Sequence, residues 1–466
     1  MLESHLSVLI AVLIGAAVLS LVLAPRAQTV EGFFRGWGAS GQLPGVLTLT
    51  FSQVTTWIFA RSLLNAGILG YFFGVAGALA YSAYYASFLT GWLIVDRLRF
   101  HHDAENIQGF LEARFGRLGV ACFNLLVSLR LLSEVFANLL VVGIVFGVAG
   151  SSGYSWAILA VAGVTLLYSM TGGLRASLRT DVVQMSFLLV LLVALFVIML
   201  AHPLFAAAPV AASSPDITGA GWVLLIVALL QVLSYPMHDP VMMDRGFIAD
   251  RKTTKRSFLH AFWISTLCIL AFGLVGVFAG LHRVGEEDLM ATLQRLLGTP
   301  AMLILGAALV ISAASTMDST FSSASKLAVM DMKLGRPNAR NGRIAMALFC
   351  IGGVGLVFFG TDDLYAATAV SGTASLFLTP VIVFSIFLGR EVKTWAYFTT
   401  FVTAVGLSIV YFLENSGYTA VMGEMSGLEH SYSKLLLITL VVLAVGFGSF
   451  ALGLKPRRVE RAASAL

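Results

Sequence analysis

The chain has 466 residues, of which 58% are hydrophobic and 11% are charged, and its mean hydropathy is +0.90. Soluble domains carry about a quarter charged residues, so this composition excludes a soluble globular protein and indicates a polytopic membrane protein. The formal net charge of +5 does not indicate nucleic-acid binding, because the basic residues lie in short clusters between apolar segments.

The apolar segments are long enough to cross a membrane as helices. Windows of about 20 apolar residues predict about thirteen transmembrane helices. The first of them follows an N-terminus without the basic stretch of a signal peptide, so we expect it to be retained. The predicted spans are 6–24, 44–70, 74–95, 116–148, 153–170, 179–203, 219–242, 257–281, 298–330, 342–360, 363–389, 394–413 and 433–454.

Basic residues are concentrated in alternate loops. By the positive-inside rule, this asymmetry places the N-terminus outside and the C-terminal tail in the cytoplasm of a plasma membrane, with a bacterial inner membrane favoured. The only basic residues inside the predicted spans are Arg61, Arg130 and Lys326. The intervening loops contain only Arg283, Arg295 and Lys434. The basic residues of the predicted cytoplasmic loops and tail are Arg26, Arg35, Arg97, Arg99, Arg114, Arg117, Arg175, Arg179, Arg245, Arg251, Lys252, Lys255, Arg256, Lys333, Arg336, Arg340, Arg343, Arg390, Lys393, Lys455, Arg457, Arg458 and Arg461.

Two spans are interrupted by polar residues, and their spacing predicts an internal repeat. The span 44–70 contains the polar run 48–57, and the span 219–242 contains the run 231–240. Discontinuous helices of this kind occur in transporters, where freed backbone groups face ions and solutes at mid-membrane. The predicted units are an N-terminal helix and loop (1–43), two inverted repeats of five helices (44–203 and 204–390), and two C-terminal helices with a basic tail (391–466).

Hydroxyl side chains crowd one face of the span 298–330. Ser312, Ser315, Thr316 and Ser319 share a stripe at helical spacing, and Asp318 lies beside it. Lipid offers these groups no hydrogen-bond partner, so the stripe must face other helices or a cation. Hydroxyl, carbonyl and carboxylate oxygen atoms are the ligands that hard cations prefer. Close helix packing by small polar residues is the alternative.

Three further stretches resemble the sodium/solute symporter family. They are Tyr168–Gln184 (YSMTGGLRASLRTDVVQ), Ala314–Ser319 (ASTMDS) and Asp244–Lys252 (DRGFIADRK). The resemblance implies the inverted-repeat fold of the leucine transporter and Na+ as the coupling ion, without an organic cofactor. It also implies secondary active symport of a small polar organic solute such as a carboxylate or amino acid.

The resemblance implies where cations bind. The common sodium site would use the backbone carbonyls of Phe51 and Val54 with oxygens of Ser312, Ser315 and Thr316. A possible second cation site would combine Asp181 with Ser315, Asp318 and Ser319. Two nearby carboxylates repel each other unless a cation lies between them or one of them holds a proton. Coupling to two sodium ions, and coupling to one sodium ion and one proton, therefore both stay open. Asp181 could instead cap the helix that opens near residue 179.

The resemblance also implies a solute cavity between core helices one, two, three, six and ten. Polar groups there would orient the solute, while aromatic rings would cover its apolar part. Arg130 of the third core helix either binds a solute carboxylate or pairs internally with Glu134. Aromatic packing alone could also account for the rings. The candidate residues are Gln53, Thr55, Thr56, Trp57, Arg130, Gln231, Ser234 and Tyr235.

We therefore predict a symporter rather than an enzyme, because no catalytic triad, metal triad or catalytic carboxylate pair occurs at a shared membrane depth. A proton-coupled symporter of the same fold, a passive channel and a sensor are the alternatives. The expected partners are the solute and membrane lipid, with no nucleic acid and a monomeric functional unit.

Overall fold

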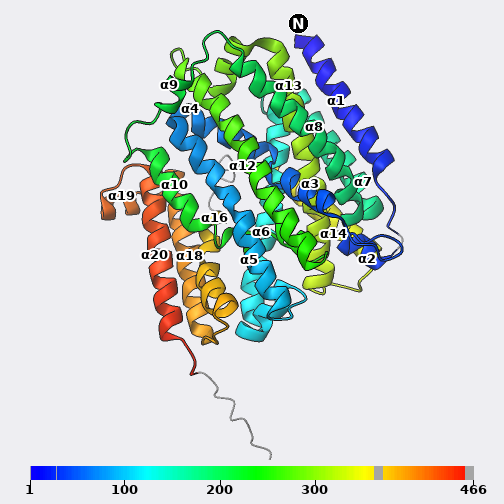
Figure 1. The fold of residues 1–466 in the computed structure, drawn as a ribbon, viewed down its shortest axis with the longest axis vertical. Helices are drawn as coiled ribbons and strands as arrows, with labels where there is room; N and C mark the ends of the chain where they lie inside the picture. The colour runs from blue at the N-terminus through cyan, green and yellow to red at the C-terminus, as the bar shows by residue number, and fades with distance from the viewer. Residues whose placement is uncertain (1, 28, 361–370, 457–466) are drawn as a thin grey trace, which may run out of the picture.

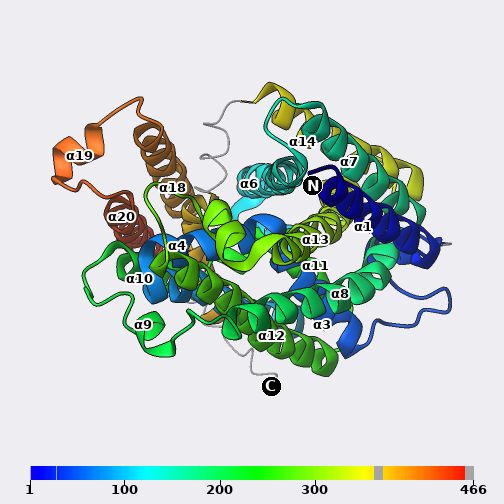
Figure 2. The ribbon, with the colours of Figure 1, turned by 90° about the horizontal axis from the view of Figure 1, so that it is seen from above.

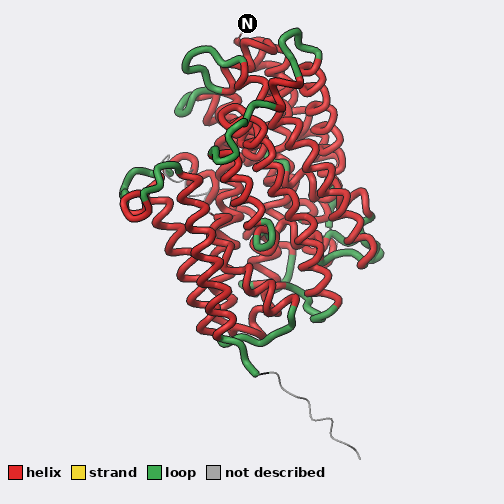
Figure 3. Tube along the Cα trace, turned by 60° about the vertical axis from the view of Figure 1, so that its left-hand side comes forward, coloured by secondary structure: helices red, strands yellow, loops and turns green. Residues whose placement is uncertain are grey.

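Helices form nearly all of the secondary structure in the computed structural model, which describes residues 2–27, 29–360 and 371–456 (Figure 3). Within these ranges the only strand-like feature is an isolated antiparallel bridge between Val392 and Leu454. The predicted all-α class is confirmed.

Nine helical segments of the described ranges are long and apolar enough to cross a membrane. They comprise α4 (Ala60–Ala83) with α5 (Ser87–Phe100), α6 (Ile107–Phe146), α7 (Ser152–Gly172), α8 (Leu174–Leu200), α12 (Arg251–Leu281), α13 (Leu289–Lys326), α14 (Ala339–Phe359), α18 (Thr394–Asn415) and α20 (Ser431–Leu452). This confirms a multi-pass membrane protein, while the count of thirteen spans stays a prediction.

The remaining helices complete the described chain. Those with an apolar stretch, or flanking the broken regions, are α1 (Leu2–Leu23), α3 (Val46–Trp57), α10 (Ala220–Gln231), α11 (Pro240–Gly246), α16 (Ser371–Ala374) and α17 (Leu378–Pro380). The others are α2 (Val30–Arg35), α9 (Ala207–Ala211) and α19 (Val421–Ser426). Short 3₁₀ or π turns are η1 (Tyr84–Ala86), η2 (Tyr235–His238), η3 (Leu327–Asp331), η4 (Ser375–Phe377) and η5 (Val381–Phe387). The start of the predicted span 363–389 and the basic residues 457–461 lie outside the described residues.

Two long helices turn sharply at a glycine in corresponding places. Gly116 in α6 has φ 72° and ψ −177°, and Gly298 in α13 has φ 72° and ψ −180°. This region of backbone space is open essentially to glycine alone. Each glycine is the tenth residue of its helix, counted from Ile107 and Leu289. Because α6 and α13 correspond to the third and eighth core helices, the shared turn supports an inverted repeat; the proposed unit boundaries stay predictions.

The first and sixth core helices are discontinuous, as predicted. Between α3 and α4 the backbone leaves the helix at Ile58, with φ −87° and ψ 60°. Between α10 and α11 the chain passes through the 3₁₀ turn Tyr235–His238, and Asp239 is extended. Pro236 and Pro240 favour this second break, because proline cannot donate the backbone hydrogen bond of a continuous helix.

The broken helices lie in the interior of the bundle (Figures 1 and 2). Viewed from above, α11 and α13 lie near the centre and α3 and α8 lie beside α12, with α18 and α20 on one flank and α1, α7 and α14 on the other. The start of α1 and the end of α20 lie at opposite ends of the molecule. This arrangement agrees with termini on opposite sides of the membrane.

Candidate ion and solute site

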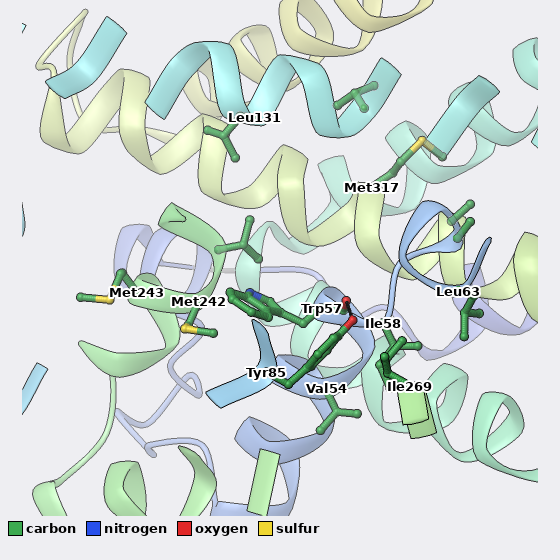
Figure 4. Packing of buried hydrophobic residues seen from close by; sticks show 14 of the residues in the cluster. Val54, Trp57, Ile58, Leu63, Tyr85, Leu131, Met242, Met243, Ile269 and Met317 are labelled. Carbon is green, nitrogen blue, oxygen red and sulfur yellow. Dashed lines mark hydrogen bonds between the residues drawn. The ribbon is translucent and has the colours of Figure 1, made fainter. Parts of the chain in front are cut away.

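Side chains from neighbouring helices satisfy the backbone at the break between α3 and α4. Ser312 donates a hydrogen bond to the carbonyl of Ile58, and the Tyr85 hydroxyl donates to that of Trp57 at 2.7 Å. The Asn138 amide oxygen accepts from the N–H of Ala60 at 3.2 Å. Figure 4 shows Trp57 and Tyr85 side by side at this point, joined by their hydrogen bond. A break inside a membrane requires such partners, since lipid provides none.

The hydroxyl stripe of α13 faces the same break. Thr316 Oγ1 lies 3.3 Å from the carbonyl oxygen of Thr55 and 3.5 Å from that of Thr56. Thr55 Oγ1 in turn donates to Ser315 Oγ at 3.0 Å. Together with Ser312, these side chains are fully buried. The structure thus brings hydroxyls and main-chain carbonyls together without nitrogen or sulfur ligands, which is the chemistry that suits an alkali cation.

The two predicted carbonyl ligands, Phe51 and Val54, lie four residues and one residue before Thr55, the first residue whose carbonyl α13 contacts. The Val54 carbonyl accepts a helical hydrogen bond from the N–H of Ile58 at 2.9 Å. Phe51 is part of the same helix and is half-buried. The described contacts of α13 instead reach the carbonyls of Thr55, Thr56 and Ile58. These later carbonyls were not singled out from the sequence, because hydropathy does not locate the residue at which a helix breaks.

Asp181 lies inside α8, so the alternative that it caps this helix is wrong. The helix begins at Leu174, and the Asp181 side chain is fully buried. Its Oδ1 atom accepts from Ser315 at 2.8 Å, and its Oδ2 atom accepts from Ser52 of α3 at 2.5 Å. Ser319 lies 3.3 Å from the same Oδ2 atom. Asp181 is therefore joined directly to the stripe of α13.

Asp318 belongs to the same polar cluster. Thr180 Oγ1 donates to its Oδ2 atom at 2.9 Å, and Ser177 Oγ lies 2.8 Å from its Oδ1 atom. The same Ser177 oxygen lies 3.2 Å from Asp181 Oδ2. One hydroxyl thus lies between two buried carboxylates. The four residues of the predicted second cation site, Asp181, Ser315, Asp318 and Ser319, meet at one place.

A buried arginine also lies in this cluster, and sequence reasoning missed its place. Arg245 of α11 is fully buried, so its assignment to a cytoplasmic loop is wrong. Its guanidinium donates to Ser319 Oγ at 2.7 Å and to Ser52 Oγ at 3.0 Å, and lies 3.8 Å from Asp181 Oδ2. The available signal was the apolar run VMM directly before Asp244 and Arg245.

A cavity of about 390 Å³ extends from the two breaks toward the loop between α18 and α20. Trp57, Arg130, Gln231 and Tyr235, four of the predicted solute ligands, line it. The ring of Trp57 lies 5.4 Å from that of Tyr235 and 5.7 Å from that of Tyr85, both edge to face. Such a wall can hold the apolar part of a small molecule.

The other predicted solute ligands point elsewhere or lie deeper. Thr55 and Thr56 are bonded to Ser315 and Ser319 of α13, at 3.0 and 3.2 Å. Ser234 Oγ lies 3.5 Å from Ser375 Oγ. Gln53 is fully buried, and neither end of its amide has a hydrogen-bond partner among the described residues. A buried amide without partners is costly, which makes Gln53 a candidate contact for a bound polar group.

Arg130 contacts two carboxylates rather than one. Its Nη2 atom donates to Asp239 Oδ2 at 3.2 Å and lies 3.7 Å from Glu134 Oε1. Asp239, which also caps α11 through Met242, was not considered as a partner from the sequence. Only the spatial return of the sixth core helix onto α6 places it there. The Nε atom of Arg130 has no described partner.

An ionic cluster lies at the opposite end of the bundle. Lys326 Nζ lies 2.8 Å from Asp244 Oδ1 and 2.9 Å from Asp331 Oδ2. The Lys326 side chain therefore has two acidic partners at this end of α13. Arg99 also donates to the carbonyl of Gly246 at 2.6 Å. These contacts tie α11 to α5 and to the end of α13, beside a further cavity of about 820 Å³ that Arg99, Lys326 and Asp331 line.

The fold and this site define a multi-pass membrane protein with discontinuous helices at its centre. Residues 37–207 match the model of the sodium:solute symporter family. This match confirms the family resemblance predicted from the sequence.

Solved structures share the fold at low sequence identity. One, a substrate-bound outward-open state of a Na+-coupled sialic acid symporter, aligns with a TM-score of 0.72 at 16% identity, covering 97% of this chain and 98% of that chain. A nucleobase-cation-symport-1 family transporter, closed with bromovinylhydantoin bound, aligns with a TM-score of 0.56 at 13% identity, covering 92% and 96%. Both likenesses establish the leucine-transporter-like fold.

Proposed function

We propose that this protein is a sodium-coupled secondary active symporter that imports a small polar organic solute by alternating access. The observation that carries the proposal is the meeting of the α13 hydroxyls with the break after α3. The family match, whose description names sodium and solute, supports it. So does the Na+-coupled symport described for the sialic acid transporter of similar fold.

The proposed sodium site combines the main chain around Phe51 and Val54 with Ser312, Ser315 and Thr316. Neutral oxygens hold a monovalent cation weakly enough for it to leave again, which transport requires. Because the ligands come from two separate helices, a bound ion would hold α3 against α13. Sodium binding would thereby favour one arrangement of the two repeats over the other.

For the solute, we propose the cavity beside Trp57, Gln231 and Tyr235, with Gln53 and Arg130 as deeper polar contacts. The unpartnered Gln53 amide and Arg130 Nε can orient a polar group. A solute carboxylate would have to share Arg130 with Asp239 and Glu134. This competition favours a solute that also offers a hydrogen-bond donor to those carboxylates, as an amino acid does.

The arrangement corresponds to an outward-facing state in our proposal. The cavity extends toward the loop between α18 and α20, which the charge pattern places outside, while Lys326 joins Asp244 and Asp331 at the other end. We also propose a plasma-membrane location with the N-terminus outside, and a monomeric functional unit.

Proton coupling is the second candidate. The observation in its favour is the Ser177 hydroxyl between Asp181 and Asp318, because the single guanidinium of Arg245 compensates the charge of only one of these two buried carboxylates. In this version, one of the pair carries the transported proton.

A thermal-shift screen of metabolites, with and without Na+, tests the leading proposal, since a ligand that binds the folded state raises the melting temperature. A solute that stabilises the protein only when Na+ is present supports sodium coupling. The same solute is then used for uptake into proteoliposomes under separate sodium and proton gradients. Full uptake without Na+ would reject sodium coupling in favour of the proton.

A further inference from the structure

The Arg245 guanidinium is held among the oxygen atoms of the predicted second cation site. Its Nη2 atom lies 2.7 Å from Ser319 Oγ and 3.3 Å from Ser177 Oγ, and its Nε atom lies 3.0 Å from Ser52 Oγ. Its Nη1 atom donates to the carbonyl of Val241 at 3.1 Å, one turn earlier in the chain. The side chain is therefore fixed from its own helix as well as from α3, α8 and α13.

The hydroxyls that Arg245 contacts are the groups that also contact the two acids. Ser52 and Ser319 donate to Asp181, and Ser177 lies between Asp181 and Asp318. All of these side chains are nearly inaccessible to solvent. The guanidinium of Arg245 therefore brings a positive charge into the cluster.

Charge balance then limits the number of further cations. Two ionised carboxylates and one guanidinium leave a single uncompensated negative charge. One Na+ between α3 and α13 would supply the missing charge, because Ser315 contacts both Thr55 at the break and Asp181. A second Na+ would make the buried cluster positive and would compete with Arg245 for Ser319.

We infer that Arg245 is the resident second cation of this transporter, and that its guanidinium restricts coupling to one Na+ per solute. This inference rests on the proposed sodium-coupled symport and specifies its stoichiometry. Arg245 acts here as a specificity-determining residue. Its place on α11, the inner half of the sixth core helix, means that movement of α11 would carry this charge toward or away from Asp181.

The test compares Arg245→Gln, which removes the charge, with Arg245→Lys, which keeps it. In reconstituted protein, the Na+ to solute ratio is obtained from the voltage at which coupled flux reverses. We expect a ratio of one for the unaltered protein and for Arg245→Lys, and a ratio of two for Arg245→Gln. Arg256→Gln, an exposed arginine of α12, is the matched control for loss of a basic residue and should keep a ratio of one.

A ratio of two in the unaltered protein, or a ratio of one in a functional Arg245→Gln variant, would overturn the inference while leaving sodium symport intact. Uptake without any need for Na+ would instead overturn the proposed function. If Arg245→Gln does not transport, equilibrium binding of radioactive Na+ to the purified protein gives the number of sites directly. The double variant Arg245→Gln with Asp181→Asn, which removes both charges, should bind one Na+; two sites in that variant would also contradict the inference.

Discussion

Thr316 offers the sharpest test of the proposed sodium site, because its hydroxyl matters little to the fold. Its oxygen lies 3.3 and 3.5 Å from the carbonyls of Thr55 and Thr56, at the long end of hydrogen-bond distances. Replacing Thr316 with Ala removes this hydroxyl and a buried methyl group, so it should cost about 1–2 kcal/mol of folding stability.

The same replacement should weaken Na+ binding more than it lowers folding stability. Interactions of a polar group with a charge are worth about 1.5–3 kcal/mol. Loss of one ligand oxygen should thus weaken Na+ binding by about 10- to 100-fold, since each 1.4 kcal/mol is a factor of ten. The assay is the Na+ concentration that gives half of the maximal sodium-dependent rise in melting temperature, with K+ keeping ionic strength constant.

Two variants on the same helix serve as controls. Thr316→Ser keeps the hydroxyl and should retain Na+ affinity within a few-fold. Ser322→Ala removes a buried hydroxyl that donates to the Asp318 carbonyl at 2.9 Å, one turn further on, and should leave the Na+ response unchanged. An unchanged half-maximal Na+ concentration in Thr316→Ala would move the ion site away from the break after α3.

Three further predictions concern closure, backbone and an external ion pair. Lys326→Gln leaves the carboxylates of Asp244 and Asp331 facing each other. We expect the free energy of unfolding to fall by about 3 kcal/mol, the low end for a broken buried ion pair. Chemical denaturation measures this change, and Lys326→Arg should retain stability. Gly298→Ala forces alanine to φ 72° and ψ −180° and should lower the folding stability by about 1–3 kcal/mol. Gly406→Ala is the control, because an added methyl group meets nothing within 4 Å there, and it should be neutral or stabilising. Equal melting temperatures for the two variants would contradict the assigned turn at Gly298. Hydrogen bonding to Arg295 lowers the pKa of Glu287 to about 2, so this pair stabilises the folded state above about pH 4.5, the unperturbed value, and loses its effect as the pH falls toward 2. The melting-temperature difference between the unaltered protein and Arg295→Gln should accordingly be constant from neutral pH to about pH 5 and shrink below it; a difference that grows on acidification would show that the pair is not formed.

The sequence was sufficient to predict the architecture because membrane helices leave strong local patterns. Apolar windows, alternate basic loops and the polar runs 48–57 and 231–240 follow from the cost of exposing charges and backbone groups to lipid. The stripe at Ser312, Ser315 and Thr316 was visible for the same reason, and the structure places it against α3.

Contacts between distant segments were not predictable in this way. Arg245 follows Asp244 and precedes a basic loop, so a rule that counts charges assigns it to the cytoplasm; only the packing of α11 against α3, α8 and α13 buries it. The pairing of Arg130 with Asp239 likewise joins residues 109 positions apart. Lys326 finds Asp244 because the sixth core helix returns to the end of the eighth.

The capping role considered for Asp181 shows that hydropathy locates helix ends poorly. The predicted span began at residue 179, since Arg175 and Arg179 lower the local hydropathy, and this made a capping role plausible. The helix in fact begins at Leu174, directly after Gly173 with φ 55°. Five extra residues move Asp181 from the helix terminus to an interior position beside Ser315.

Uphill solute uptake is the most direct test of the central claim. Proteoliposomes containing the purified protein are loaded with K+ and diluted into Na+, using a solute identified by sodium-dependent stabilisation and with no proton gradient. The proposed mechanism predicts transient accumulation above the external concentration, which collapses when an ionophore dissipates the Na+ gradient. Equal uptake with K+ on both sides, or flux that never exceeds equilibration, would contradict sodium-coupled symport.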